Sequence, residues 1–345
     1  MKVAVIFGGK SAENHISRLS AVSIINHLDP KRYEIIMIGI SKEGKWYHYM
    51  GPVDGLKQEA WYDDGEPVDG MAMLSDPTID VIFPVLHGTN GEDGTIQGLF
   101  ELVDKPYVGC GVLASAVCMD KAYAKVICEK EGIPACKYCV FARREIEQNA
   151  PACAAQAETK LGYPIFVKPS NAGSSFGVSK AKDQDDLIIA LKLAAQYDKR
   201  VLAEEFVDGR EIECAVLGNQ EVQVAPPGEV VAANEFYDYE AKYLNDQSRT
   251  EVPAALTEPQ RMEVCDYAKR VFQCLDCKGL SRVDFFLDRR TGQFLFNEIN
   301  TLPGFTNISM YPMMWEADGL GYSALLDRLI ALAFENYREQ KRCYS

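Results

Sequence analysis

The chain has 345 residues, of which 47% are hydrophobic and 25% charged, a composition typical of a globular protein with two or three domains. Its formal net charge of −14 argues against nucleic acid and anionic membranes as general partners, because both are bound through an excess of Lys and Arg. Met1 leads straight into an apolar run without a charged leader, and no apolar run approaches about 18 residues, so we expect a cytoplasmic protein.

Residues 1–115 alternate apolar runs with helical patterns, which predicts an open parallel α/β sheet as a first domain. The expected strands are 3–7, 34–40 and 81–85, and the expected helices are 17–28 and one beginning near Gly94. Two loops that follow strands of this sheet carry Glu13 and His87, at the edge where open α/β sheets bind ligands. Glu13 can pair with a ligand ammonium or cap the first helix, whereas a histidine such as His87 is more often structural.

Residues 116–208 read as a second, smaller α+β unit. The expected helices are 121–131, 152–161 and 185–197, and the expected strands are 138–141, 163–167, 177–180 and 201–206. The loop from Lys168 to Gly177 follows a buried strand and offers backbone N–H groups and hydroxyls that can fold over phosphate oxygens. Lys168 adds a point charge there, and Lys121 is a second candidate cation; a flexible hairpin tip with incidental lysines is the alternative.

Residues 209–345 form the third expected unit. It contains a strand at 211–217, a polar aromatic loop at 234–248, a long helix and a hairpin at 281–300, and it ends in an apolar helical stripe from Leu325 to Phe334 that indicates core packing. The connection from Glu204 to Glu211 joins two strands and can present backbone groups and acids to adenine and ribose, or it is simply an acidic surface turn.

The hairpin is the strongest functional signal. If Asp288 pairs with Phe294 across the turn, the same register sets Asp284 opposite Glu298 and Arg282 opposite Asn300, all on one face. Two carboxylates about 5 Å apart repel each other. Asp, Glu and Asn with water and phosphate oxygens are ligands that Mg²⁺ accepts, so the pattern predicts a magnesium site unless the charges are simply splayed into water.

Two nearly matching phosphate motifs are rejected. Gly39 to Lys45 has the spacing of a P-loop, but Trp46 stands where the metal-binding Ser or Thr is needed, in a strand-turn-strand context. The run from Gly109 to Ala114 imitates a dinucleotide fingerprint but lacks a convincing βαβ unit with a downstream acid.

The eleven cysteines are scattered through apolar stretches, which is typical of reduced, buried thiols and not of a disulfide framework. Two Cys-x-x-Cys pairs, Cys136/Cys139 and Cys274/Cys277, together admit a zinc site. The second pair ends an apparent amphipathic helix, so we favour core packing for it.

Taken together, six motifs resemble those of the D-alanine–D-alanine ligases, in order over essentially the whole chain. They are Phe7–Glu13, Leu86–Gly94, Gly173–Gly177, Phe236–Tyr243, Arg282–Asp284 and Asn297–Thr306. The resemblance implies an ATP-grasp fold with domains 1–115, 116–208 and 209–345. It implies that ATP and two Mg²⁺ ions, for which Mn²⁺ can substitute, serve the phosphorylation of one D-alanine and its ligation to a second for peptidoglycan synthesis. A homodimer is expected on the same basis.

The resemblance also implies a role for each matching residue. Asp284, Glu298 and Asn300 would hold the metal ions, and Arg282 and the N–H of Gly304 would stabilise the tetrahedral oxyanion. Glu13, in a network with Ser174 and Tyr243, would receive the first ammonium group, and Ser309 the second carboxylate, with His87 and Met310 also at the substrate. The expected ATP-binding residues are Lys121, Lys168, Ser174, Ser175, Glu204, Glu205, Val207, Glu211, Lys242, Phe286 and Asn297. Segment 234–248 would close the site and exclude water.

Departures from the family pattern concern the second substrate. His15 stands where the family usually has an acid, and Phe176 resembles vancomycin-resistance ligases that accept D-serine or D-lactate. Met310 replaces the Arg of those enzymes, and Lys242 with Tyr243 resembles the dipeptide-forming type. We therefore expect D-alanine as second substrate, then D-serine, then D-lactate. The remaining alternatives are an ATP-grasp ligase for another acid and amine, and a nucleotide-binding regulator without turnover.

Overall fold

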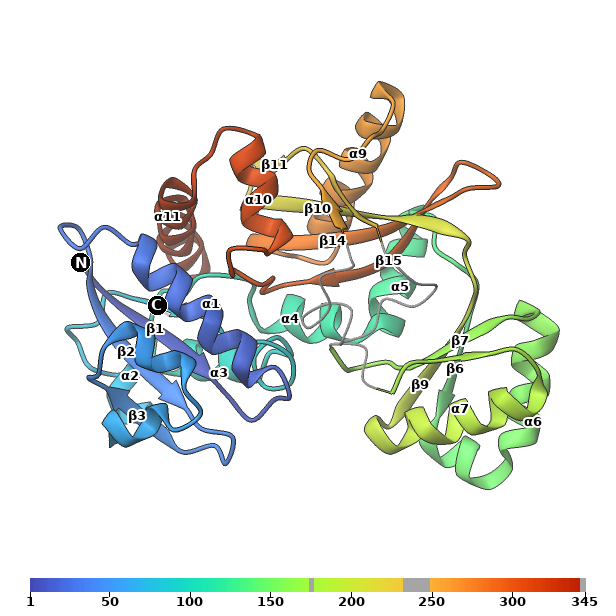
Figure 1. Ribbon diagram of the computed structural model, residues 1–345, viewed down its shortest axis with the longest axis horizontal. Helices are drawn as coiled ribbons and strands as arrows, with labels where there is room; N and C mark the ends of the chain where they lie inside the picture. The colour runs from blue at the N-terminus through green and yellow to red at the C-terminus, as the bar shows by residue number, and fades with distance from the viewer. Residues whose placement is uncertain (174–176, 232–248, 342–345) are drawn as a thin grey trace.

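The computed structural model describes residues 1–173, 177–231 and 249–341, and these form three β-sheets with their covering helices. In Figure 1 the N-terminal sheet lies at one end of the molecule, the smallest sheet lies at the other, and the largest sheet lies between and above them. Within the described ranges no helix is both long and apolar enough to cross a membrane.

The N-terminal sheet has the strand order β4-β3-β2-β1-β5. Its strands are β1 (Lys2–Gly8), β2 (Glu34–Ile40), β3 (Trp46–Tyr49), β4 (Gly65–Pro67) and β5 (Val81–Pro84). The strands β2, β1 and β5 are parallel, but β3 and β4 add antiparallel pairs at one edge. The expectation of a purely parallel sheet is therefore wrong at this edge. The rejected P-loop match lies in the β2–β3 hairpin, where the left-handed backbone of Gly44 (φ 87°) makes the turn.

Helices cover this sheet because its strands are apolar on both faces. The helices and 3₁₀ turns of this part are α1 (Asn14–His27), η1 (Val53–Lys57), η2 (Trp61–Asp64), α2 (Gly70–Leu74) and α3 (Thr95–Leu102). α4 (Val112–Met119) and α5 (Lys121–Lys130) follow and lead into the rest of the chain. One apolar core joins β1, β5 and α1 to residues of β10, α10 and α11, so the N-terminal sheet is packed against the C-terminal part of the chain.

The smallest sheet is antiparallel with the order β6-β9-β7-β8. Its strands are β6 (Tyr138–Ala142), β7 (Ile165–Pro169), β8 (Ser179–Ala181) and β9 (Arg200–Glu205), and its helices are α6 (Arg143–Leu161) and α7 (Gln184–Tyr197). α6 begins nine residues before the predicted helix, whose pattern starts at Ala152. The helix is interrupted at Asn149 (φ −157°, ψ 71°), two residues before Pro151, which explains why only its second half was predicted.

The largest sheet has the order β13-β12-β10-β14-β15, with β11 paired to β10. Its strands are β10 (Gly209–Gly218), β11 (Val222–Val224), β12 (Gly228–Val231), β13 (Arg249–Glu251), β14 (Gly279–Asp288) and β15 (Phe294–Asn300). The helices of this part are α9 (Glu258–Cys274), α10 (Met310–Ala317) and α11 (Tyr322–Gln340). One face of β14 and β15 is buried against α5 and α9.

The β14–β15 hairpin has the predicted register only at the end nearest the site. Asp284 faces Glu298 and Arg282 faces Asn300, as predicted, but the register shifts by one residue directly after Asp284. Phe294 therefore faces Leu287, and the predicted pair of Asp288 with Phe294 is wrong. The extra residue has a physical role, because Phe294 and Phe296 are fully buried in the core whereas Glu298 lines a cavity on the other face.

Candidate active site

A cavity of about 380 Å³ lies where the loops after β1 and β5 meet β7, β9, β10, β14 and β15. All the predicted site residues that the structure describes line this cavity. They are Glu13, His87, Lys121, Lys168, Glu204, Glu205, Val207, Glu211, Arg282, Asp284, Phe286, Asn297, Glu298, Asn300, Gly304, Ser309 and Met310. The predicted residues Ser174, Ser175, Phe176, Lys242 and Tyr243, and the segment 234–248, lie outside the described residues.

Three carboxylates stand in a row across three neighbouring strands. Glu213 of β10 faces Asp284 of β14, and Asp284 faces Glu298 of β15. All three side chains line the cavity, so they share one face of the sheet. Like charges in paired positions destabilise a sheet unless cations lie between them. Glu213 was missed by the sequence analysis, because its pairing with Asp284 joins segments about 70 residues apart.

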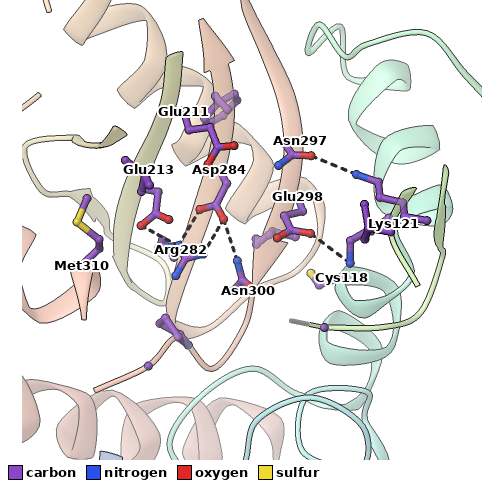
Figure 2. A pocket seen from close by; sticks show the side chains of 18 of the residues that line it. Cys118, Lys121, Glu211, Glu213, Arg282, Asp284, Asn297, Glu298, Asn300 and Met310 are labelled. Atoms are coloured by element: carbon purple, nitrogen blue, oxygen red, sulfur yellow. Dashed lines mark hydrogen bonds and ion pairs between the residues drawn. The ribbon is translucent and has the colours of Figure 1, made fainter. Parts of the chain in front are cut away.

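Two cationic side chains balance this row (Figure 2). The Arg282 guanidinium donates from Nε to Asp284 Oδ1 at 2.8 Å and from Nη2 to Asp284 Oδ2 at 2.7 Å, and its Nε lies 3.1 Å from Glu213 Oε2. At the other end of the row, Lys121 Nζ lies 3.2 Å from Glu298 Oε2. Burial lowers the pKa of Arg282, but the charges of Asp284 and Glu213 outweigh it and raise that pKa well above its ordinary value.

The bulge brings one more polar group to the cavity. Without the extra residue, Asn297 and Glu298 would point to opposite faces of β15, yet both line the cavity. Asn297 Oδ1 accepts a hydrogen bond of 3.3 Å from Lys168 Nζ of β7. Asn300 Nδ2 donates to Asp284 Oδ2 at 3.1 Å. The bulge therefore places two amides and two carboxylates of the hairpin around one space.

The donor set of this space fits a hard divalent cation. Asp284, Glu298 and Asn300 offer carboxylate and amide oxygens, which is the chemistry that Mg²⁺ and Mn²⁺ accept. In the structure Arg282 pairs with Asp284 and Lys121 pairs with Glu298, so each carboxylate of this donor set already has a cationic partner. In the described ranges no three His, Cys, Asp or Glu side chains converge as a metal-binding group, so the amide of Asn300 is needed to complete a triad.

A second charged cluster lies beside β9. Glu204 Oε1 lies 2.8 Å from Lys125 Nζ, and Glu204 Oε2 lies 2.5 Å from Lys168 Nζ. Lys125 is completely buried and also donates to the carbonyl oxygen of Phe296 at 3.1 Å. Burial raises the pKa of Glu204, but the two ammonium groups outweigh it and lower that pKa to about 2. Glu204 is therefore ionised at neutral pH, and Lys125 is a partner that the sequence analysis missed.

Apolar side chains line the cavity beside this cluster. Phe166 stacks on Phe206 with ring centroids 5.9 Å apart, and Val207 and Phe286 also line the cavity. Glu211 lies on β10, two residues before Glu213 and on the same face. This end of the cavity can thus hold a flat aromatic group between apolar walls, with acids at its edge.

The loop after β5 is tied to the loop after β15. Glu92, whose role was not predicted, accepts the N–H of Gly88 at 2.8 Å and the N–H of Leu302 at 3.2 Å. Burial and the nearby charge of Glu13 raise the pKa of Glu92 to about 8. His87 Nδ1 lies 3.0 Å from the Leu302 carbonyl oxygen, so that nitrogen carries the hydrogen, and burial lowers the pKa of His87.

Glu13 projects into the cavity from the loop after β1, and two glycines make room for it. A Cβ atom at Gly88 would lie 2.4 Å from Glu13 Oε2, and one at Gly173 would lie 2.7 Å from the same oxygen. Gly88 also has a left-handed backbone (φ 70°). Glu13 thus lies where the loops after β1, β5 and β7 meet, as its place after a parallel strand predicted.

The segment after β15 closes the other side of the cavity. Ser309 Oγ accepts the N–H of Thr306 at 2.9 Å, which holds the turn 306–309, and a Cβ atom at Gly304 would lie 3.0 Å from the same oxygen. Met310 is buried, and a Cβ atom at Gly228 would lie 2.2 Å from its Cε. His15 is exposed and hydrogen-bonded to Arg18 at 3.3 Å, and it is not among the residues that line the cavity.

The cysteines form no zinc site among the described residues. The ten described cysteines are free thiols, and the two Cys-x-x-Cys pairs lie in different surroundings. Cys136 donates to Glu204 Oε1 at 3.3 Å, whereas Cys277 lies 3.6 Å from Cys118 Sγ. Core packing accounts for most of them, as predicted for Cys274 and Cys277.

Two family models match the chain. Residues 2–110 match the model described as D-ala D-ala ligase N-terminus, and residues 127–331 match D-ala D-ala ligase C-terminus. A D-alanine–D-alanine ligase of Ruminiclostridium cellulolyticum is 51% identical, over 100% of this chain and 98% of the relative. One of Acetivibrio thermocellus is 49% identical, over 99% of this chain and 98% of the relative.

Solved structures of similar proteins give the same picture. The VanG D-Ala:D-Ser ligase from Enterococcus faecalis superposes with a TM-score of 0.87 at 39% identity, covering 96% of this chain and 99% of that one. The D-alanine–D-alanine ligase from Coxiella burnetii superposes with a TM-score of 0.86 at 35% identity, covering 99% of this chain and 95% of that one.

Proposed function

Because the chain belongs to the D-alanine–D-alanine ligase family and has its ATP-grasp fold, we propose that it joins two D-alanines at the expense of ATP for peptidoglycan precursor synthesis. The products are D-alanyl-D-alanine, ADP and phosphate. The two family models match residues 2–110 and 127–331, and the relatives cover essentially the whole chain, which supports one activity for both ends of the cavity. We also propose the family's division into domains 1–115, 116–208 and 209–345, a cytoplasmic location and a homodimer.

The observation that carries the proposal is the row of carboxylates with its two cations, open to one cavity with Glu13 at its far side. In the first step, a carboxylate oxygen of one D-alanine attacks the γ-phosphorus of ATP, and ADP leaves. In the second, the amine of another D-alanine attacks the acyl carbon. Phosphate then leaves with that carboxylate oxygen, and the amine loses a proton. Both steps need charge stabilisation and exclusion of water more than covalent help from the protein.

The nucleotide end is formed by the charged cluster beside β9. Lys121 and Lys168 bind phosphate oxygens, and Lys168 leaves Glu204 to do so. Glu204 and Glu205 lie at the adenine edge with Val207 and Phe286, Asn297 joins the phosphate contacts, and Glu211 lies near the ribose. Lys125 stays on Glu204 throughout, so the carboxylate keeps a counter-ion when Lys168 turns to the nucleotide.

Asp284, Glu298 and Asn300 are the proposed ligands of two Mg²⁺ ions. When bound, such ions neutralise charge on the phosphates and polarise the transferred group. For the ions to bind, the ion pairs of Arg282 with Asp284 and of Lys121 with Glu298 must open. Lys121 can then pair with a phosphate group, and Arg282 with the oxyanion.

The amino-acid end lies between the loops after β1, β5 and β15. Glu13 receives the ammonium group of the first D-alanine, and neutral His87 fixes the Leu302 carbonyl beside it. Arg282 and the N–H of Gly304 stabilise the oxyanion, and Ser309 beside Met310 binds the carboxylate of the second D-alanine. Ser174, Ser175, Tyr243 and Lys242 keep the roles that the resemblance implies, as proposals outside the described residues.

D-Alanine is favoured over D-serine as second substrate. The relatives that are 51% and 49% identical are D-alanine–D-alanine ligases, whereas the VanG enzyme is 39% identical. Met310 packs on Gly228 in the core and leaves no charged group at the place where resistance ligases carry Arg. A regulator without turnover is disfavoured, since it would need neither Arg282 nor the carboxylate row.

The test is phosphate release from ATP and Mg²⁺ on addition of D-alanine, with L-alanine as matched control. We expect release with D-alanine only. Equal release with and without D-alanine would contradict the ligase assignment and favour an ATP-binding protein of another kind.

A further inference from the structure

Glu213 has a place in the site that neither the family resemblance nor the motifs assign. It lies at the centre of β10, faces Asp284 on β14, and has Gly228 of β12 on its other side. Its side chain is 11% exposed, so its charge requires a partner. One such partner is Arg282, whose Nε lies 3.1 Å from Glu213 Oε2.

Arg282 therefore has two carboxylates, one of which has a second task. In the proposed function Asp284 binds metal, and its oxygens are then no longer available to the guanidinium. A divalent cation beside Arg282 would also repel it. Glu213 is absent from the proposed ligand set, so its contact with Arg282 does not compete with metal binding.

The order of the row separates the two tasks. Asp284 stands between Glu213 and Glu298, so a cation held by Asp284 and Glu298 would be held on the Glu298 side of the row and not by Glu213. Figure 2 shows the Arg282 guanidinium on the side of Asp284 that faces Glu213. Within the carboxylate row, Asp284 and Glu298 are thus available to the metal ions, and Glu213 is available to Arg282.

We propose that Glu213 is a positioning residue, which holds the Arg282 guanidinium toward the reacting carbonyl while Asp284 is occupied by metal. This proposal rests on the proposed function. Glu213 touches no reacting atom; it fixes the direction of the group that does. Removing the Glu213 carboxylate lowers turnover more than it lowers the affinity for nucleotide or metal. Neither ligand requires a fixed orientation of the Arg282 guanidinium in order to bind.

The test compares Glu213→Gln with Glu229→Gln. Glu229 is a matched control, because it pairs with Arg210 at 2.5 Å in the same sheet, its side chain is 10% exposed, and it does not line the cavity. Three quantities are measured for each variant and the parent: kcat and KM for ATP from D-alanine-dependent phosphate release, Mn²⁺ affinity of the ADP complex by titration calorimetry, and the melting temperature. Asp284→Asn serves as the standard for loss of a metal ligand.

For Glu213→Gln we expect kcat to fall on the order of 10- to 100-fold, with KM for ATP and Mn²⁺ affinity within about threefold of the parent. Glu229→Gln should keep the parental kcat. A kcat within about twofold of the parent would overturn the proposal. A Mn²⁺ affinity reduced as strongly as in Asp284→Asn would also overturn it, because Glu213 would then be a metal ligand.

Glu213→Asp keeps the test decisive if the Gln variant unfolds. It retains the charge on a shorter side chain, so we expect an intermediate kcat with parental Mn²⁺ affinity, and a fully parental kcat would contradict the proposal. Absence of phosphate release from the parent would instead defeat the proposed function, and the Mn²⁺ titrations would still show whether Glu213 binds metal.

Discussion

Asp284 and Glu298 face each other across β14 and β15, and the strand register changes by one residue directly beyond them. The pair places two carboxylates on the cavity face, while the bulge returns Phe294 and Phe296 to the core. In a regular strand Phe294, Phe296 and Glu298 would share one face, so the bulge is what separates the two buried rings from the carboxylate at the cavity.

Replacing Asp284 or Glu298 by Ala should lower kcat at least about 100-fold, because each change removes a proposed metal ligand. Both variants should remain folded, since neither side chain belongs to the apolar core, and Asp284→Ala should lower the melting temperature more than Glu298→Ala because Arg282 loses two hydrogen bonds. Phosphate release and thermal unfolding measure the two effects. Glu263→Ala, an exposed carboxylate on α9, is the control, and unchanged turnover in both site variants would refute the metal site.

Glu92 predicts a pH dependence of stability. Its pKa is raised to about 8 in the folded state, so the folded protein keeps a proton that the unfolded chain releases above its ordinary pKa of 4.5. Stability from this group is complete at low pH and is lost as pH rises toward about 8, by up to about 1.4 kcal/mol per pH unit.

Denaturant unfolding of the parent and of Glu92→Gln between pH 6.5 and 9 measures this dependence. Gln copies the neutral acid and should flatten the decline over this range. The lowered pKa of His87 acts in the opposite direction, with stability lost as pH falls below about 6.5. Buried thiols with raised pKa, such as Cys110 and Cys214, also lose stability toward pH 9, so the difference between the parent and Glu92→Gln is what reports Glu92. Parallel curves for the two proteins would show that Glu92 is ionised throughout.

Lys125→Met should lower the free energy of unfolding by about 3–5 kcal/mol, because it leaves a buried carboxylate with one cation instead of two. KM for ATP should rise, since Lys168 would then be the sole counter-ion of Glu204. Lys130→Met, on the exposed face of the same helix, should change stability by less than about 0.5 kcal/mol. Equal stability of the two variants would mean that the buried pair contributes nothing.

The second substrate can be identified from the products. With D-alanine and an excess of D-serine or D-lactate, mass spectrometry should detect D-alanyl-D-alanine as the main product, because the cavity wall at Met310 is apolar. A main product that contains D-serine would contradict the assignment of D-alanine as second substrate and would indicate a ligase of the vancomycin-resistance type. Met310→Leu is a conservative control and should keep the same product.

The sequence predicted the residues of the site better than the strand register and the long-range contacts that position them. Alternation in β14 and β15 gave the pairing of Asp284 with Glu298, and local loops after strands gave Glu13 and His87. The bulge had a signal that was overlooked, because Phe294 and Phe296 are two residues apart whereas Ile299 follows after three. A regular strand cannot bury all three on one face.

Other features depend on contacts between distant segments. The roles of Glu213 and Lys125 depend on their ion pairs with Arg282 and Glu204. Neither pair joins residues close in sequence, so no local sequence pattern predicts it. Glu92 lies within the motif Leu86–Gly94 but received no role of its own, since its raised pKa follows from burial beside a segment some 200 residues later. The antiparallel edge of the first sheet was not included in the predicted sheet, although residues 39–46 were recognised as strand-turn-strand, because β3 and β4 have only four and three residues.

The central claim is that a D-alanine carboxylate is phosphorylated by ATP and then joined to a second D-alanine. Incubation with ATP, Mg²⁺ and D-alanine labelled with ¹⁸O in its carboxylate tests it most directly. We predict that D-alanyl-D-alanine and phosphate form in equal amounts and that each phosphate carries one ¹⁸O. Unlabelled phosphate, or phosphate without dipeptide, would contradict the account.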